Sequence, residues 1–146
     1  MAFDAIVRGA RGILYWGTSS VEKDSPFWRK LLGLVRELSS LEPVLSARDA
    51  KRRLRVEVGG TWGSVDNGDV VRVLAKDVDG EPWLLVVNER EEPLEYTIHG
   101  LRRLNGVELA DPAADRRATV TGGRLRLSIK PFGVQILGPV SSTIRE

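Results

Sequence analysis

The sequence predicts a mainly β protein: an antiparallel β-sandwich preceded by a strand and a helix of the α/β type. Hydrophobic residues recur with a period of two from Leu54 onward. A helical period dominates residues 26–41, and a short apolar run at 13–16 shows no alternation. With 42% hydrophobic and 29% charged residues, the composition is that of a globular chain.

The first 47 residues carry the helical signals. MAFDAIVR is typical of the last two turns of a helix that ends at Gly9. Further on, Ser25 is suited to cap a helix, Pro26 to begin it and Pro43 to end it. The apolar stripe of this second helix is broad and needs a large partner surface. It consists of Phe27, Leu31, Leu34, Leu38 and Leu41, widened by Trp28, Leu32 and Val35.

Between the two helices, residues 12–16 are predicted to form a strand. The run Ile13-Leu14-Tyr15-Trp16 lacks alternation, which predicts burial on both faces, as in a parallel sheet. The backbone N–H and C=O groups of such a strand need partners in neighbouring strands. The strand is therefore expected to pair with segments that this chain does not contain.

The sandwich is predicted over residues 54–146, after a linker at 48–53 with the sequence RDAKRR. Asp79-Gly80 and Gly122-Gly123 are typical of tight hairpin turns within it. Its predicted strands are short segments bounded by turn residues: 54–59, 69–77, 82–89, 94–100, 105–110, 123–131 and 133–139.

The sequence resembles the C-terminal part of (β/α)₈-barrel retaining glycoside hydrolases, the clan that includes many β-galactosidases and cellulases. The resemblance lies in MAFDAIVRGARGILYWGTSS, in FWRKLLGLVRELSSLEPVLSA and in a sandwich that ends KPFGVQIL. It implies that residues 1–47 are a fragment of an α/β barrel, with the last strand at 12–16 and the last helix at 26–41. Residues 54–146 would be the accessory sandwich. Met1 would then lie within a longer protein.

The resemblance also implies which chemistry is present. Retaining glycosidases use two carboxyl groups about 5–5.5 Å apart, and in similar enzymes these follow the fourth and seventh barrel strands, which would precede Met1. No catalytic residue is therefore expected here. The parent protein is expected to act on O-glycosidic bonds, and this chain alone to be inactive.

Trp16 is the candidate substrate-binding residue. It ends the predicted strand, which places it at the mouth of the barrel, where active sites of this fold lie. Its ring would stack on a sugar and form the wall of a subsite. The alternative is that Trp16 belongs to the core, as aromatic residues of buried strands usually do. Tyr15 is expected to point to the opposite face and to pack against the helices.

Other polar residues have a simpler explanation than function. The loop after the strand would offer hydroxyl and carboxyl groups to a sugar, but solvent exposure explains these residues equally well; they are Thr18, Ser19, Ser20 and Asp24. Asx-Gly turns explain the following residues better than calcium loops do: Asp66, Asn67, Asp69, Asp77 and Asp79. The run from Glu89 to Glu92 is expected to be a solvated hairpin loop.

No metal, cofactor, nucleic acid or membrane is expected as a partner. His99 is the only histidine and cysteine is absent, which excludes the commonest transition-metal sites. The net charge is only +2, with basic residues scattered among acidic ones. No apolar run approaches the roughly 18–20 residues that cross a membrane. The expected partners are a carbohydrate, the missing barrel and, through exposed apolar surface, other copies of the chain.

Two other interpretations remain open from the sequence. The sandwich could be a non-catalytic carbohydrate-binding module, with Trp62 as its stacking residue; Trp83 is expected in the core instead. It could also be a structural domain without a ligand, in which the helix at 26–41 packs across one sheet. The position of that helix distinguishes the structural-domain interpretation from a barrel fragment, whereas the role of Trp62 tests the carbohydrate-binding module.

Overall fold

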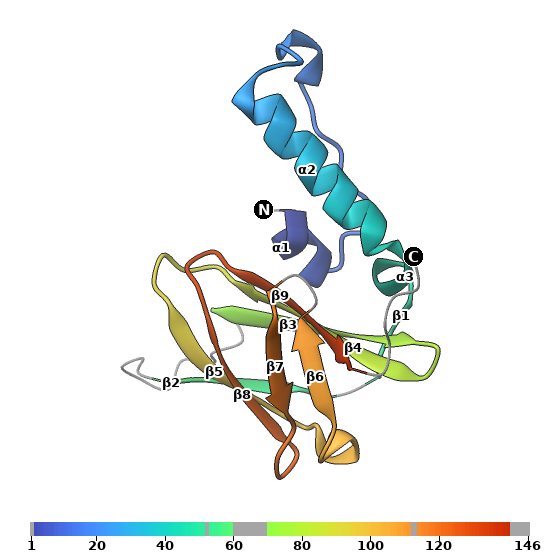
Figure 1. Ribbon diagram of the computed structural model, residues 1–146, viewed down its shortest axis with the longest axis vertical. Coiled ribbons are helices and arrows are strands. Elements are labelled where there is room, and N and C mark those ends of the chain that lie inside the picture. Colours follow the sequence, from blue (N-terminus) through green and yellow to red (C-terminus); the bar gives the residue numbers. More distant parts are fainter. Residues whose placement is uncertain (1, 52, 60–69, 112–113, 141–146) are drawn as a thin grey trace.

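The fold was determined as a computed structural model that describes residues 2–51, 53–59, 70–111 and 114–140 (Figure 1). It confirms a mainly β protein with two antiparallel sheets stacked as a sandwich. The helical segments are α1 (Ala2–Val7), η1 (Thr18–Ser20), α2 (Pro26–Ser40), α3 (Glu42–Leu45) and η3 (Arg102–Leu104). The strands are β1 (Arg48–Asp49), β2 (Arg55–Gly59), β3 (Val71–Val78), β4 (Glu81–Asn88), β5 (Leu94–His99), β6 (Glu108–Asp111), β7 (Arg116–Thr119), β8 (Arg124–Ile129) and β9 (Val134–Pro139).

The larger sheet has the strand order β1-β3-β4-β9-β6-β7, and the smaller sheet has the order β2-β5-β8. All seven predicted strands form, with ends that differ from the predicted ones by at most three residues. The β3–β4 turn is also confirmed, because Asp79 and Gly80 both have positive φ, as a type I′ hairpin requires. Two short strands were missed. β1 lies within the predicted linker, and β7 is a polar segment that pairs with β6.

Strand β4 is the centre of the fold because both of its faces are buried. Leu84 and Val86 face the smaller sheet and belong to the core between the sheets. Trp83, Leu85 and Val87 face the other way and pack under the helical segments. The continuous apolar run at residues 82–87 of this antiparallel strand is thus explained by a second apolar layer outside the sandwich.

That second layer is formed by α1 and α3. Phe3, Leu41 and Val44 are buried against the outer face of the larger sheet. Helix α1 ends as predicted: Gly9 has φ +98°, and the amides of Gly9 and Ala10 donate to the carbonyls of Ile6 and Ala5.

Helix α2 begins and ends close to the predicted residues. The Ser25 side chain accepts a hydrogen bond from the Trp28 amide (3.2 Å) and caps the helix. No residue of α2 is fully buried, and the helix projects away from the sandwich in Figure 1. The apolar stripe therefore forms as predicted, but described residues cover only part of it. No helix in the described ranges is long and apolar enough to cross a membrane.

The predicted strand at residues 12–16 is not a strand in this structure. The segment has no regular secondary structure and runs beside α2 to that helix's far end (Figure 1). The physical reason is that a strand requires a hydrogen-bonded neighbour, and the described strands of this chain all pair with one another in the two sheets of the sandwich.

Candidate functional site

The segment at residues 13–16 keeps the side-chain alternation of a strand although it has no ladder. Leu14 and Trp16 are 82% and 91% exposed, whereas Ile13 and Tyr15 are 36% and 37% exposed. Alternate side chains of an extended chain point to opposite faces, so Ile13 and Tyr15 face one way and Leu14 and Trp16 the other. Trp16 presents its ring to solvent and is not a core residue of the described structure.

The inner face of this segment borders a groove of about 740 Å³. Ile13 and Tyr15 line it from one side and Val35 and Leu38 of α2 from another. The prediction that Tyr15 faces the helices agrees with this position. Leu74 of β3 also lines it, so the groove joins the helical segment to the outer face of the larger sheet.

One buried cation lies at the sheet side of this groove. Lys76 is almost fully buried, and its Nζ contacts Asp49 Oδ1 at 2.7 Å and donates to the Ala47 carbonyl at 3.1 Å. Arg11 approaches the other Asp49 oxygen at 3.7 Å. The hydrogen bond from Lys76 lowers the pKa of Asp49, which keeps this carboxyl ionised at neutral pH. Asp49 is therefore a partner for two cations and is unsuited to donate a proton to a leaving group.

A second ionic cluster joins α1 to the sandwich. Arg8 contacts Asp4 at 2.9 Å and Glu89 at 2.6 Å, and Glu89 also contacts Arg72 of β3 at 2.8 Å. The neighbouring side chains of Glu89 and Arg8 lower the pKa of Asp4. The prediction of a solvated loop at residues 89–92 is thus wrong for Glu89, which fixes the end of α1. The pair Arg8–Glu89 spans 81 residues of sequence, so no local pattern signals it.

The loop after Trp16 is arranged by contacts within itself. Gly17 has φ +76° and is the N-cap residue of η1, and the Ser20 hydroxyl donates to the Gly17 carbonyl at 3.0 Å. The Asp24 carbonyl accepts a hydrogen bond from Arg29 at 2.7 Å. Ser19 and the Asp24 side chain are exposed, and Thr18 is half-buried. These residues lie near Trp16 in sequence, but nothing in their geometry forms a closed polar pocket among the described residues.

The remaining sequence candidates have structural positions. Asp77 Oδ1 accepts the Gly80 amide at 2.9 Å, which is the expected Asx-Gly turn. His99 Nε2 contacts Glu57 at 2.9 Å on the face of the smaller sheet. Trp83 is 3% exposed, so its predicted core position is confirmed; its buried Nε1 has no hydrogen-bond partner among the described residues. Trp62 lies outside the described residues, as do Asp66, Asn67 and Asp69.

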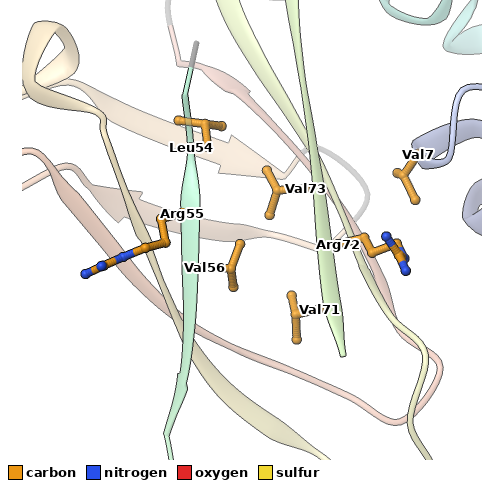
Figure 2. Close-up of a pocket in the computed structure, with 7 residues that line it drawn as sticks. All are labelled: Val7, Leu54, Arg55, Val56, Val71, Arg72 and Val73. Atoms are coloured by element: carbon orange, nitrogen blue, oxygen red, sulfur yellow. The ribbon is translucent and has the colours of Figure 1, made fainter. Parts of the chain in front are cut away.

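A smaller cavity of about 200 Å³ lies between β2 and β3 (Figure 2). Val56, Val71 and Val73 point into the space between the two strands, whereas the guanidinium of Arg55 points away from it. Ligand sites combine apolar walls with a few convergent polar groups. The side chains drawn in Figure 2 supply apolar walls, but their polar groups do not converge on the cavity. We therefore interpret this cavity as a gap in the packing and not as a ligand site.

The outer face of the smaller sheet does not offer an aromatic platform. The side chains that alternate outward from β2, β5 and β8 are polar or small, and none of them is Trp, Tyr or Phe; they are Arg55, Glu57, Gly59, Glu95, Thr97, His99, Arg124, Arg126 and Ser128. Glycan-binding faces rely on exposed aromatic rings. This described face carries no such ring, whereas Trp62, the stacking residue of the carbohydrate-binding-module interpretation, lies outside the described residues, so that interpretation stays a prediction.

Comparison with known proteins gives a match at the level of fold. No family model matches the sequence, and no curated protein does. A substituted form of AmyP solved in complex with maltotriose superposes with a TM-score of 0.57 at 19% identity, over 82% of this chain and 22% of the AmyP chain. AmyP in complex with maltose gives a TM-score of 0.56 at 20% identity, over 82% of this chain and 23% of that chain.

The chain therefore shares its fold with part of AmyP and spans less than a quarter of the AmyP chains it matches. A match over 82% of 146 residues extends across about 120 residues, more than the predicted sandwich at 54–146 contains. Part of the segment before the sandwich is consequently included in the shared fold.

Proposed function

We propose that this chain is the C-terminal part of a glycoside-hydrolase-like protein. It contributes the last strand and helix of a barrel and an accessory sandwich, and it supplies a sugar-subsite wall but no catalytic carboxylate. The observation that carries this proposal is the segment at 13–16, which has strand alternation and no strand neighbours. Next to it, α2 leaves Phe27, Leu32 and Val35 of its apolar stripe exposed.

A barrel would satisfy both features at once. Its neighbouring strands would complete the ladder of residues 12–16, and its outer helices would cover the stripe of α2. Trp16 would then face the mouth of the barrel and Tyr15 the helical layer. The AmyP match supports this arrangement, because it extends beyond the sandwich and AmyP is more than four times as long as the matched part.

The proposal assigns Trp16 to substrate binding only. The ionised Asp49 and the ion-paired Glu89 are structural partners of cations, and the catalytic carboxyl pair belongs to the remainder of the protein. The AmyP structures contain maltotriose and maltose. Maltooligosaccharides are accordingly the first substrates to test, together with the β-galactosides and β-glucans to which the sequence resemblance points.

The decisive experiment compares this chain with the gene product extended to the upstream in-frame start. Amide hydrogen exchange at residues 12–16 is expected to be fast in the chain alone and slow in the extended product, because only the latter supplies strand partners. Slow exchange at residues 12–41 in the isolated monomer would contradict the proposal.

A mutation tests the role of Trp16 in the extended product. Trp16→Ala is expected to lower kcat/KM on the best of these sugars by about 10- to 100-fold, since an aromatic contact with the substrate is lost. Trp16→Phe keeps an aromatic face and serves as the matched control, with most of the activity retained. Equal activity of the Trp16→Ala variant and the parent would remove Trp16 from the substrate site.

A further inference from the structure

The apolar outer face of the larger sheet continues beyond the helices that cover it. Ile136 of β9 and Val87 of β4 are buried in the cluster under α1 and α3. Val134 pairs directly with Val87 and lies on the same face as Ile136, two residues along the strand. Val134 is nevertheless 36% exposed, and Phe132, in the turn before β9, is 63% exposed. The described part of the chain therefore leaves one end of this apolar face open.

The turn that carries Phe132 holds it in an unfavourable backbone conformation. Phe132 has φ +49°, in the left-handed region that bulky residues rarely occupy. Its amide donates to the Arg90 carbonyl at 2.9 Å. Glycine or asparagine would fit this position with less strain. An aromatic ring that is displayed to solvent at such a cost indicates a contact outside the described fold.

Asn88 makes this arrangement rigid. It is buried, and its Nδ2 donates to the carbonyls of Glu92 and Lys130, both at 2.9 Å, while its Oδ1 accepts the Arg90 amide at 2.9 Å. These bonds join the connection at 89–93 to the turn at 130–133. We refer to these two connected segments as the loop platform.

The loop platform adjoins the existing contact between helix and sheet. Glu89 belongs to it and contacts Arg8 at the end of α1 at 2.6 Å. Figure 1 shows α1 above the larger sheet, with α3 on one side of it and, on the other, the loop platform at the upper left corner of the sandwich. The open patch formed by Phe132 and Val134 is therefore continuous with the interface that α1 already makes.

We infer that Phe132 and Val134 are the docking site for an amphipathic helix, the neighbour of α1 in the outer helical layer of the barrel. This inference rests on the proposed function and extends it, because it names the sandwich residues that hold the barrel. Phe132 inserts between the apolar side chains of that helix, and Val134 extends the contact from the cluster under α1. A central aromatic anchor with an apolar surround is typical of such interfaces.

The test is Phe132→Asn, measured by thermal unfolding in two contexts. In the chain alone, the melting temperature is expected to stay constant or rise by about 2–4 °C, since strain is relieved and no packing is lost. In the extended gene product, it is expected to fall by at least about 2 °C, because the docking helix loses its anchor. Val134→Thr, which keeps the shape and the strand propensity, is expected to be neutral in the first context and destabilising in the second.

The possible results separate this inference from the proposed function. A lower melting temperature of Phe132→Asn in the chain alone would show that the ring packs within the chain, which overturns the inference. Equal changes of the melting temperature in both contexts would overturn the inference too. In that case, slow amide hydrogen exchange at residues 12–16 in the extended product would still support the proposed function. Fast amide hydrogen exchange at residues 12–16 in the extended product would overturn both the inference and the proposed function.

Discussion

Val44→Ala tests whether the helical segment is packed on the sandwich in solution. Val44 of α3 is 1% exposed and belongs to the cluster with Trp83 and Leu85 on the outer face of β4. The substitution removes two methyl groups at about 0.8 kcal/mol each and leaves a cavity, so we expect a loss of about 1.5–3 kcal/mol in the free energy of unfolding. Urea unfolding followed by tryptophan fluorescence measures it.

Val35→Ala is the matched control, because it makes the same change on the exposed stripe of α2, where Val35 is 46% exposed. We expect a change within about 0.5 kcal/mol. If Val44→Ala were as mild as Val35→Ala, the contact of α3 with β4 would not persist in solution. The outer face of β4 would then have no stable second apolar layer in solution.

Three other substitutions test further contacts of the structure. Gly138→Ala should destabilise the chain by about 1–3 kcal/mol in urea unfolding, because its Cβ would lie 2.5–2.6 Å from the ring of Trp83. The hydrogen-bonded ion pair with Lys76 lowers the pKa of Asp49 below its ordinary value of 3.8. The contribution of this ion pair to the free energy of unfolding is therefore complete above pH 3.8 and is lost as the pH falls further. Unfolding curves from pH 6 to pH 3 should accordingly show a smaller acid-induced loss for Asp49→Asn than for the parent. Val35→Glu should reduce self-association in light scattering without lowering the melting temperature, since it places a charge on an uncovered apolar stripe.

Periodicity was sufficient to predict the elements whose partners lie within the chain. The strands β2, β3, β4, β5 and β8 carry apolar residues that other described strands cover, and the hairpin at Asp79-Gly80 has its own local signature. The cap of α2 by Ser25 is equally local. These features need only neighbouring residues, which explains why the sequence reveals them.

Features that depend on distant contacts were missed or misassigned. β7 has the sequence RRAT and is a strand only because β6 pairs with it. Glu89 belongs to an acidic run, and its two arginine partners come from other elements. Residues 12–16 have the composition of a strand but lack a neighbour to pair with. The role of Trp16 stays a prediction, because it depends on groups that would come from the rest of the protein.

The burial of both faces of β4 limits how this chain can be shortened. A shortened chain that starts after the segment at 48–53 would expose Trp83, Leu85 and Val87 as an apolar ribbon several residues long. It would also lose β1, leaving the edge of β3 open to pairing with other molecules. Excision at this point should give an aggregating product, so anyone seeking a soluble sandwich should retain α1 and α3 as its cover.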